Sequence, residues 1–131
     1  MTELDTNVLV RYLAQDDAKQ SAQASRLIES FSPQRPGFIG MVNLVELVWV
    51  LQSCYDAEHA TVVATLDRLL RTRTLVLENA EAVAAALRLF ATGHKDFADC
   101  LILCAAKLAG CERIYSFDKQ AIRRVGMTAL S

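Results

Sequence analysis

Acidic residues stand at comparable points of this sequence, where a short apolar run gives way to an amphipathic segment. Asp5 and Asp118 each end an apolar run, and Glu46 lies near the start of a long apolar segment. Asp96 and Asp99 open a late amphipathic segment. A carboxylate at such a point can cap a helix by accepting backbone N–H bonds, whereas several carboxylates together can hold a hard divalent cation. Both kinds of chemistry have to be weighed.

Helix capping is the simpler interpretation of each acid taken alone. The segments from Asn43 to Glu46 and from Asp96 to Asp99 have the spacing of a cap followed by a reciprocating acid. The joint placement favours a further role, because the carboxyl ends of parallel strands and the helices that follow them share one edge of a sheet. Carboxylates gathered there would repel one another unless a cation neutralises them. No His or Cys cluster accompanies them, so we predict Mg²⁺ or Mn²⁺ rather than zinc.

Glu46 gives a second indication of a metal site. It is the only charged residue between Arg35 and Asp56, and its segment is apolar nearly all round, which predicts a buried helix. A carboxylate on a buried helix is unfavourable unless it is paired or binds a metal. Its place in the first helical turn, or a nearby arginine, could also satisfy it, and the metal interpretation is the favoured one.

An alternation of short apolar runs and longer amphipathic segments positions these acids, and it predicts an α/β fold with a short, mainly parallel central sheet. The expected strands cover residues 2–4, 38–41, 74–77, 113–117 and 128–130. The expected helices cover residues 7–14, 18–31, 43–55, 58–71, 81–90, 96–109 and 119–125. Gly110 is expected just after the end of one helix.

Composition limits the classes of protein that this chain can be. Its 131 residues, 53% of them hydrophobic, predict a single domain over residues 1–131 and exclude intrinsic disorder. A net charge of −1 makes any contact with nucleic acid a local one. The short apolar runs and the acidic start predict a cytoplasmic protein without a membrane span. The four cysteines form no CxxC pair and lie in or beside apolar stretches, so we expect buried, reduced thiols.

The ordered set of motifs resembles that of the PIN-domain nucleases, and the size of the chain most resembles the VapC-type toxins of bacterial toxin–antitoxin pairs. The motifs are Asp5-Thr6-Asn7-Val8-Leu9, the lone Glu46, Asp96-Phe97-Ala98-Asp99 and Ser116-Phe117-Asp118. The resemblance implies a PIN-like, three-layer α/β/α sandwich. It also implies an endoribonuclease that depends on Mg²⁺ or Mn²⁺.

The same resemblance assigns roles to individual residues. It implies a catalytic, metal-binding set of Asp5, Glu46, Asp99 and Asp118. The third acid is Asp99 or Asp96, and Asp99 is favoured because it directly precedes the apolar helix body. Supporting roles fall to Thr6, Asn7, Asp96 and Ser116. A metal-activated water would hydrolyse the phosphodiester bond, so the products would carry 5′-phosphate and 3′-hydroxyl ends.

Substrate and partner expectations follow from the nuclease interpretation. The basic residues expected near the acidic edge, and hence near RNA phosphates, are Arg11, Lys95 and Lys119. Apolar side chains on the early helices, together with residues 42–54, suggest a homodimer face or a groove for a partner. The resemblance implies that this partner is a small antitoxin protein that blocks the acidic cleft.

Two other functions stay open at the level of sequence. One is a non-catalytic protein-interaction module of the same fold, in which the acids only cap helices. The other is a PIN nuclease that processes RNA or cleaves DNA instead of acting as a toxin. A small antitoxin-like reading frame next to the gene would favour the toxin.

Overall fold

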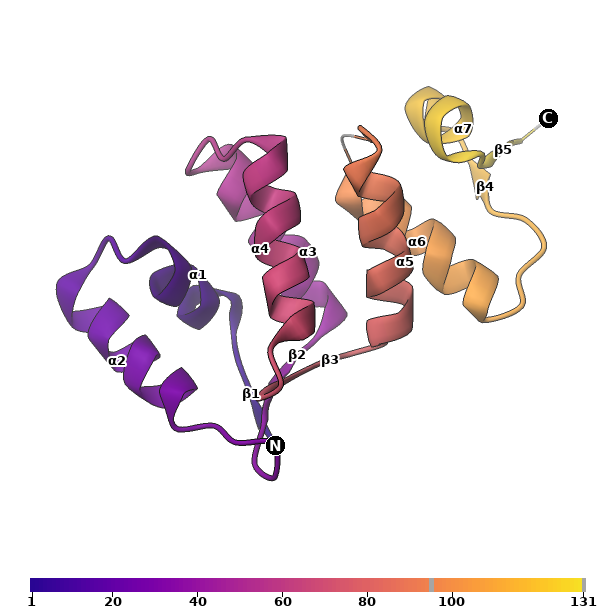
Figure 1. Ribbon diagram of the computed structural model, residues 1–131. Coiled ribbons are helices and arrows are strands. Elements are labelled where there is room, and N and C mark those ends of the chain that lie inside the picture. The colour runs from indigo at the N-terminus through magenta and orange to yellow at the C-terminus, as the bar shows by residue number, and fades with distance from the viewer. Residues whose placement is uncertain (95, 131) are drawn as a thin grey trace. The chain divides into compact units, whose positions relative to one another are not determined.

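The structure is a computed structural model that describes residues 1–94 and 96–130 (Figure 1). The chain divides into two compact units, Met1–Glu78 and Asn79–Ser131. The elements of the first unit are β1 (Thr2–Glu3), α1 (Thr6–Ala14), α2 (Ala18–Glu29), β2 (Gly37–Ile39), α3 (Met41–Ser53), α4 (His59–Arg71) and β3 (Leu75–Leu77). Those of the second unit are α5 (Ala80–Ala91), α6 (Phe97–Leu108), β4 (Tyr115–Ser116), α7 (Lys119–Val125) and β5 (Thr128–Ala129). The sequence-based expectation of one domain over residues 1–131 stays a prediction.

The sheet of the first unit joins β1, β2 and β3 in that order, and its strands run parallel. Its register pairs Thr2 with Gly37 and Gly37 with Leu75. In β3, Leu75 and Leu77 are buried whereas Val76 between them is exposed, as the alternation of side chains along a strand requires. Parallel strands need long crossovers, and the helix pairs α1–α2 and α3–α4 provide them.

The apolar faces of α1, α3 and α4 form most of the core of the first unit. Helix α1 packs against α2 and α3, and α3 packs against α4. The side chains that are at most 1% exposed include Leu9, Leu44, Leu47, Val62 and Leu66. This packing fixes the first turns of α1 and α3 close to the ends of β1 and β2, where the acids of this unit lie.

The start of α3 differs from the prediction. The helix expected over residues 43–55 begins earlier, at Met41, and its N-cap is Gly40, which makes no side-chain capping bond. The backbone N–H of Met41 instead donates to Oε1 of Glu78 at 2.9 Å. A carboxylate from the end of β3 therefore caps α3, and the predicted capping role of Asn43 is wrong.

The second unit is built on the packing of α5 against α6. The rings of Phe90 and Phe97 meet edge to face, with centroids 5.5 Å apart and an interplanar angle of 74°. Strands β4 and β5 form a short parallel pair, and α7 is the crossover between them. Helix α6 ends as predicted, because Gly110 follows its C-cap with a φ of +90°.

Two expectations from composition can be compared with the structure. Burial of the cysteines is correct for Cys100 and wrong for Cys54 and Cys111, which are exposed because they follow the ends of α3 and α6. Burial raises the pKa of the Cys100 thiol to about 11. In the described part of the chain, no helix combines the length and the apolar character that crossing a membrane requires.

The edge-to-face aromatic pair predicts a large effect of truncation on stability. Because Phe90 is fully buried, Phe90→Ala should lower the free energy of unfolding by about 3–5 kcal/mol. The matched control is Leu108→Ala, since Leu108 is exposed and its truncation should change stability by no more than about 0.5 kcal/mol. Urea unfolding followed by circular dichroism measures both, and equal effects would contradict a core role for Phe90.

Candidate functional site

Asp5 links the end of β1 to the start of α1. It is the N-cap of α1, with extended backbone, and its Oδ1 accepts a hydrogen bond from the backbone N–H of Thr6 at 2.9 Å. The side-chain amide of Asn43 also donates to this oxygen, at 3.4 Å. No hydrogen bond within the described residues uses Oδ2 of Asp5. One oxygen is thus held by the helix, and the other is available to a ligand.

A buried hydroxyl connects Asp5 to Glu46. Thr6 is 6% exposed, and its Oγ1 donates to Oε1 of Glu46 at 3.0 Å. The amide of Asn43 donates to the same Oγ1 at 3.2 Å. The first unit therefore joins two of the predicted metal ligands through Thr6 and Asn43.

Asn43 is a site residue that the sequence interpretation missed. Its spacing from Glu46 was taken as the sign of a cap, yet its amide contacts Asp5 and Thr6 across the ends of two strands. The available signal was its place one helical turn before Glu46, on the same face of a helix. Glu78 was missed as well, although it directly follows β3 as Asp5 follows the β1 segment.

Glu46 is exposed, not buried as the apolar character of its segment predicts. Val42 and Trp49 share this exposed face of α3, with 74% and 63% of their surface accessible. The buried face carries Leu44, Leu47, Val48 and Leu51. An excess of apolar residues does not show which of them a helix buries, so the predicted desolvation of Glu46 is wrong.

In the second unit, three acids lie at the starts of helices. Asp96 is the N-cap of α6, and its Oδ1 accepts a hydrogen bond from the backbone N–H of Asp99 at 3.0 Å. Asp118 is the N-cap of α7, and its Oδ1 accepts bonds from the next turn at 2.8 and 3.3 Å. The hydroxyl of Ser116 accepts a bond from the backbone N–H of Asp118 at 2.9 Å, which orients the turn after β4.

These three carboxylates share one cavity of about 430 Å³. Its lining residues are His94, Asp96, Asp99, Asp118, Gln120, Arg124 and Val125. Burial raises the pKa of Asp99, and the nearby charges of Asp96 and Asp118 raise it further. The cavity therefore brings burial and like charges together to oppose the ionisation of Asp99.

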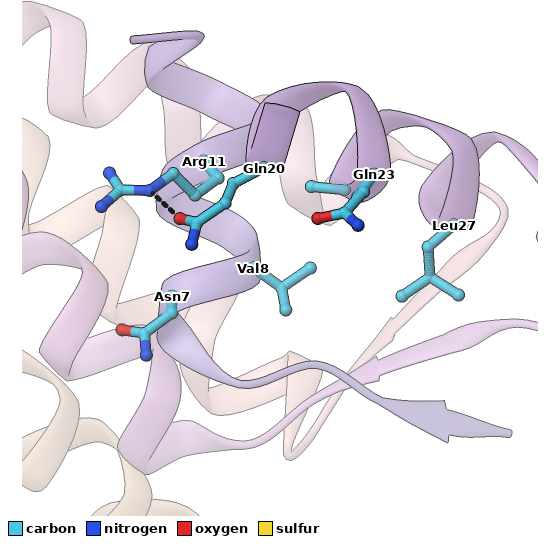
Figure 2. A pocket seen from close by; sticks show the side chains of 7 residues that line it. Asn7, Val8, Arg11, Gln20, Gln23 and Leu27 are labelled. Carbon is cyan, nitrogen blue, oxygen red and sulfur yellow. Dashed lines mark hydrogen bonds between the residues drawn. The ribbon is translucent and has the colours of Figure 1, made fainter. Parts of the chain in front are cut away.

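The basic residues predicted to bind substrate are placed differently from one another. Arg11 and Asn7 line a groove between α1 and α2 (Figure 2). Lys119 does not line the acidic cavity of the second unit; Arg124 does, together with Gln120 one turn before it. The sequence interpretation missed both, and the i, i+4 spacing of Gln120 and Arg124 on the helix after Asp118 was the signal that could have found them as a pair. Lys95 lies outside the described residues.

The donor chemistry of the acids suits a hard cation. Within residues 1–94 and 96–130, no group of three or more His, Cys, Asp or Glu side chains is arranged to hold a metal ion. Asp5 and Glu46 are joined in the first unit, and Asp99 shares a cavity with Asp118 in the second. Carboxylate oxygens are ligands that Mg²⁺ and Mn²⁺ favour, and a cation would stabilise the charged form of Asp99, which burial and the charges of Asp96 and Asp118 disfavour.

Comparison with known proteins gives two matches. The sequence matches the PIN domain family over residues 3–126. Together with the alternating helices and short parallel strands, this match confirms the predicted α/β/α fold class. A relative named VapC ribonuclease comes from Aquifex aeolicus (strain VF5). It is 24% identical over 120 residues, which cover 92% of this chain and 89% of that protein.

The raised pKa of Asp99 predicts a pH-dependent gain of stability in Asp99→Asn without divalent ions. Because the folded-state pKa lies above the unfolded one, stability falls as pH rises between the two values and stays lower above them. In EDTA the variant should therefore have the higher melting temperature at pH 7. The difference should disappear well below pH ~3.9, where the acid is protonated in both states. Calorimetry measures it, and a pH-independent difference would contradict the electrostatic cause.

Proposed function

The chain belongs to the PIN domain family, and on that premise we propose that it is an endoribonuclease that depends on Mg²⁺ or Mn²⁺. One observation carries the proposal. Asp5, Glu46 and Asp118 each accept hydrogen bonds on one carboxylate oxygen and leave the other outside the bonds of the described residues. Each acid can therefore keep its structural hydrogen bond while the other oxygen ligates a cation, which is the role that the family match supports.

The proposed metal ligands are Asp5 and Glu46 in the first unit and Asp99 and Asp118 in the second. Thr6 and Asn43 would fix Asp5 against Glu46, because their hydrogen bonds tie the two carboxylates together. Asp96 would act through the first turn of α6, since its carboxylate already accepts the backbone N–H of Asp99. Ser116 would act through the backbone of Asp118. These four residues are positioning residues in the proposal.

Phosphodiester hydrolysis in this site needs no nucleophile from the protein. A bound Mg²⁺ or Mn²⁺ would acidify a water molecule and offset charge on the phosphate oxygens. The task of the chain is then to orient carboxylates and to bind RNA. Arg124 and Gln120 line the cavity that holds Asp99 and Asp118, and they are candidates to contact the phosphate.

The biological setting is part of the proposal. The relative named VapC ribonuclease supports a toxin of a toxin–antitoxin pair, active in the cytoplasm on RNA and inhibited by a small cognate antitoxin protein. We also propose a homodimer. Processing of RNA by the same chemistry and a non-catalytic interaction module are the alternatives that the following experiment addresses.

Loss of one carboxylate charge tests the nuclease directly. Asp5→Asn keeps the oxygen that caps α1, so the fold should be preserved, while the anionic ligand is lost. Cleavage of a mixed RNA pool with Mg²⁺ or Mn²⁺ should fall by about 100-fold or more, comparable to the removal of a charge-stabilising group in other enzymes. EDTA should abolish wild-type cleavage. A folded, partner-free protein that cuts no RNA with either metal would instead favour the interaction module.

The two neighbouring acids of α6 should differ in their effect on activity. Asp96→Asn retains an oxygen that can accept the N–H of Asp99, so it should reduce kcat less than Asp99→Asn does. The latter removes a proposed ligand and should reduce kcat by about 100-fold or more. Single-turnover cleavage by the two variants gives the comparison. The reverse order would make Asp96 the third ligand and Asp99 its support.

A further inference from the structure

A groove of about 540 Å³ lies between α1 and α2, within the first unit (Figure 2). Three amide side chains and one guanidinium line it, together with small or aliphatic residues. The lining residues are Asn7, Val8, Arg11, Gln20, Gln23, Ala24 and Leu27. No carboxylate is among these residues, all of which the structure describes. The groove therefore presents three amides and one guanidinium on a surface that is otherwise mainly apolar.

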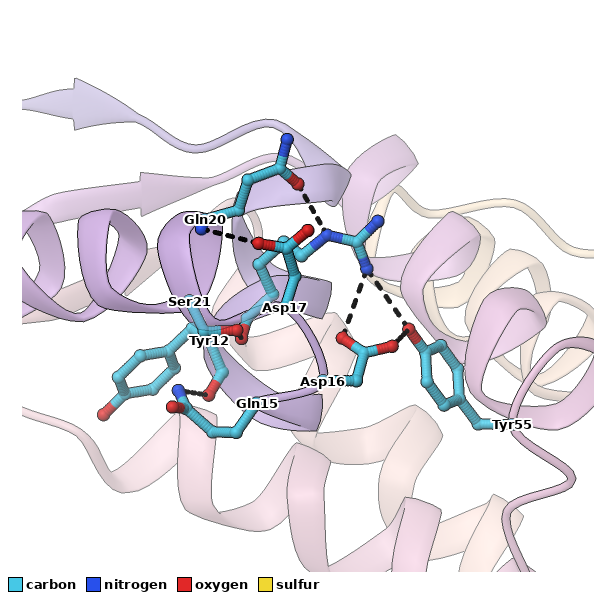
Figure 3. Close-up of polar contacts among 8 residues, drawn as sticks. Tyr12, Gln15, Asp16, Asp17, Gln20, Ser21 and Tyr55 are labelled. Atoms are coloured by element: carbon cyan, nitrogen blue, oxygen red, sulfur yellow. Dashed lines mark hydrogen bonds and ion pairs between the residues drawn. The ribbon is translucent and has the colours of Figure 1, made fainter.

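The guanidinium of Arg11 is held in place by Gln20, Asp16 and Tyr55, which Figure 3 labels. Its Nε donates to Oε1 of Gln20 at 2.7 Å, and its Nη1 donates to Oδ1 of Asp16 and to the hydroxyl of Tyr55, both at 3.3 Å. The hydroxyl of Tyr55 donates to Oδ2 of Asp16 at 2.7 Å. These partners come from α2, from the turn before it and from the segment after α3.

Arg11 keeps a free side in this arrangement. None of the hydrogen bonds among the described residues uses its Nη2, and its side chain is 35% exposed. The hydrogen bond from Tyr55 lowers the pKa of Asp16, and the charge of Arg11 lowers it further, so Asp16 stays ionised and the cluster stays intact at neutral pH. Because its Nε and Nη1 are already held, Arg11 loses little side-chain entropy when its Nη2 binds a ligand.

The groove starts at Asn7, two residues after the proposed catalytic Asp5. Asn7 and Arg11 are one turn apart on the same face of α1, and Asp5 caps that helix. Arg11 is six residues after Asp5, or about 9 Å along the helix axis. An RNA strand that is bound at Asp5 and continues along α1 would therefore place a neighbouring phosphate beside Arg11.

We propose that the α1–α2 groove binds the stretch of single-stranded RNA next to the scissile bond, with Arg11 on a neighbouring phosphate. Tyr55 and Asp16 are positioning residues for Arg11. The assignment rests on the proposed nuclease function. The unused Nη2 of Arg11 and the three amides of the lining favour RNA, because amides can pair with the base edges of an unstacked RNA strand while a guanidinium donates to phosphate.

The experiment measures the affinity of a labelled single-stranded oligoribonucleotide that the wild-type protein cuts. Binding is followed by fluorescence anisotropy at several salt concentrations with Mg²⁺, in the Asp5→Asn background so that the RNA stays intact. Arg11→Gln, Arg11→Lys and Tyr55→Phe are compared with the matched control Arg26→Gln, an exposed arginine of α2 that does not line the groove. Thermal unfolding verifies the fold of each variant.

Arg11→Gln should weaken RNA binding by about 10-fold or more. It should also reduce the slope of log affinity against log salt by about 0.7, the value for one phosphate contact on a single strand. Arg11→Lys should keep the slope and lose part of the affinity. Tyr55→Phe should weaken binding by about 2- to 10-fold and, with Asp5 intact, raise KM with little change in kcat. Arg26→Gln should behave as the parent protein.

Other outcomes separate this inference from the proposed function. If the wild-type protein cuts RNA while Arg11→Gln binds it with unchanged affinity and slope, the groove is not an RNA site and the nuclease assignment stands. If Arg11→Gln cuts RNA normally but escapes inhibition by its partner protein, the groove binds that protein and the inference is overturned. If the wild-type protein neither binds nor cuts RNA, the proposed function fails and the inference fails with it. A Tyr55→Phe variant that folds allows the same decision if Arg11→Gln does not.

Discussion

Asp5, Asp96 and Asp118 accept backbone N–H bonds at the starts of helices, and the rest of the candidate site depends on this N-cap interaction. A cap fixes a carboxylate against the first helical turn, so its position follows from the packing of the helix and not from a mobile loop. The same bond uses only one of the two oxygens. Capping and metal binding are therefore compatible roles of one residue, and the first can prepare the second.

The carboxylates of the two units differ in their hydrogen-bond donors and in the charges around them. In the first unit, neutral donors satisfy the acids, since the hydroxyl of Thr6 bonds Glu46 and the amide of Asn43 bonds Asp5. In the second unit, no side-chain donor among the described residues bonds Asp99, and burial together with the charges of Asp96 and Asp118 raises its pKa. The folding of the second unit thus retains unfavourable electrostatic free energy. A cation that binds at Asp99 would release it, which couples metal affinity to the stability of this unit.

The polar contacts around Arg11 serve the fold and the proposed function at once. They join α1 to the turn before α2 and to the segment after α3, so they contribute to the packing of these helices. At the exposed surface such bonds add little stability, because water competes for every partner. Their larger effect is to hold one guanidinium in a defined orientation beside the groove.

The sequence by itself determined the features that depend on near neighbours along the chain. The alternation of strands and helices, the end of α6 before Gly110 and the capping bond from Asp96 to the N–H of Asp99 follow from local spacing, because caps and turns involve residues only a few positions apart. Only the tertiary structure decided features that join distant segments. The carboxylate of Glu78 accepts the N–H of Met41 at the start of α3, and the amide of Asn43 contacts Asp5, and no local pattern contains either contact.

The burial of Glu46 and the identity of the basic residue near the acids were also decided by the tertiary structure. The apolar segment around Glu46 predicted a buried carboxylate, yet packing decides which face of α3 is covered and leaves Glu46 exposed with Trp49. The order of residues predicted that Lys119 lies near the acids. The direction of each side chain from its helix instead brings Arg124 to the acidic cavity. Residue types and order are local properties that a sequence carries, whereas the face that a helix presents is set by its packing against other helices.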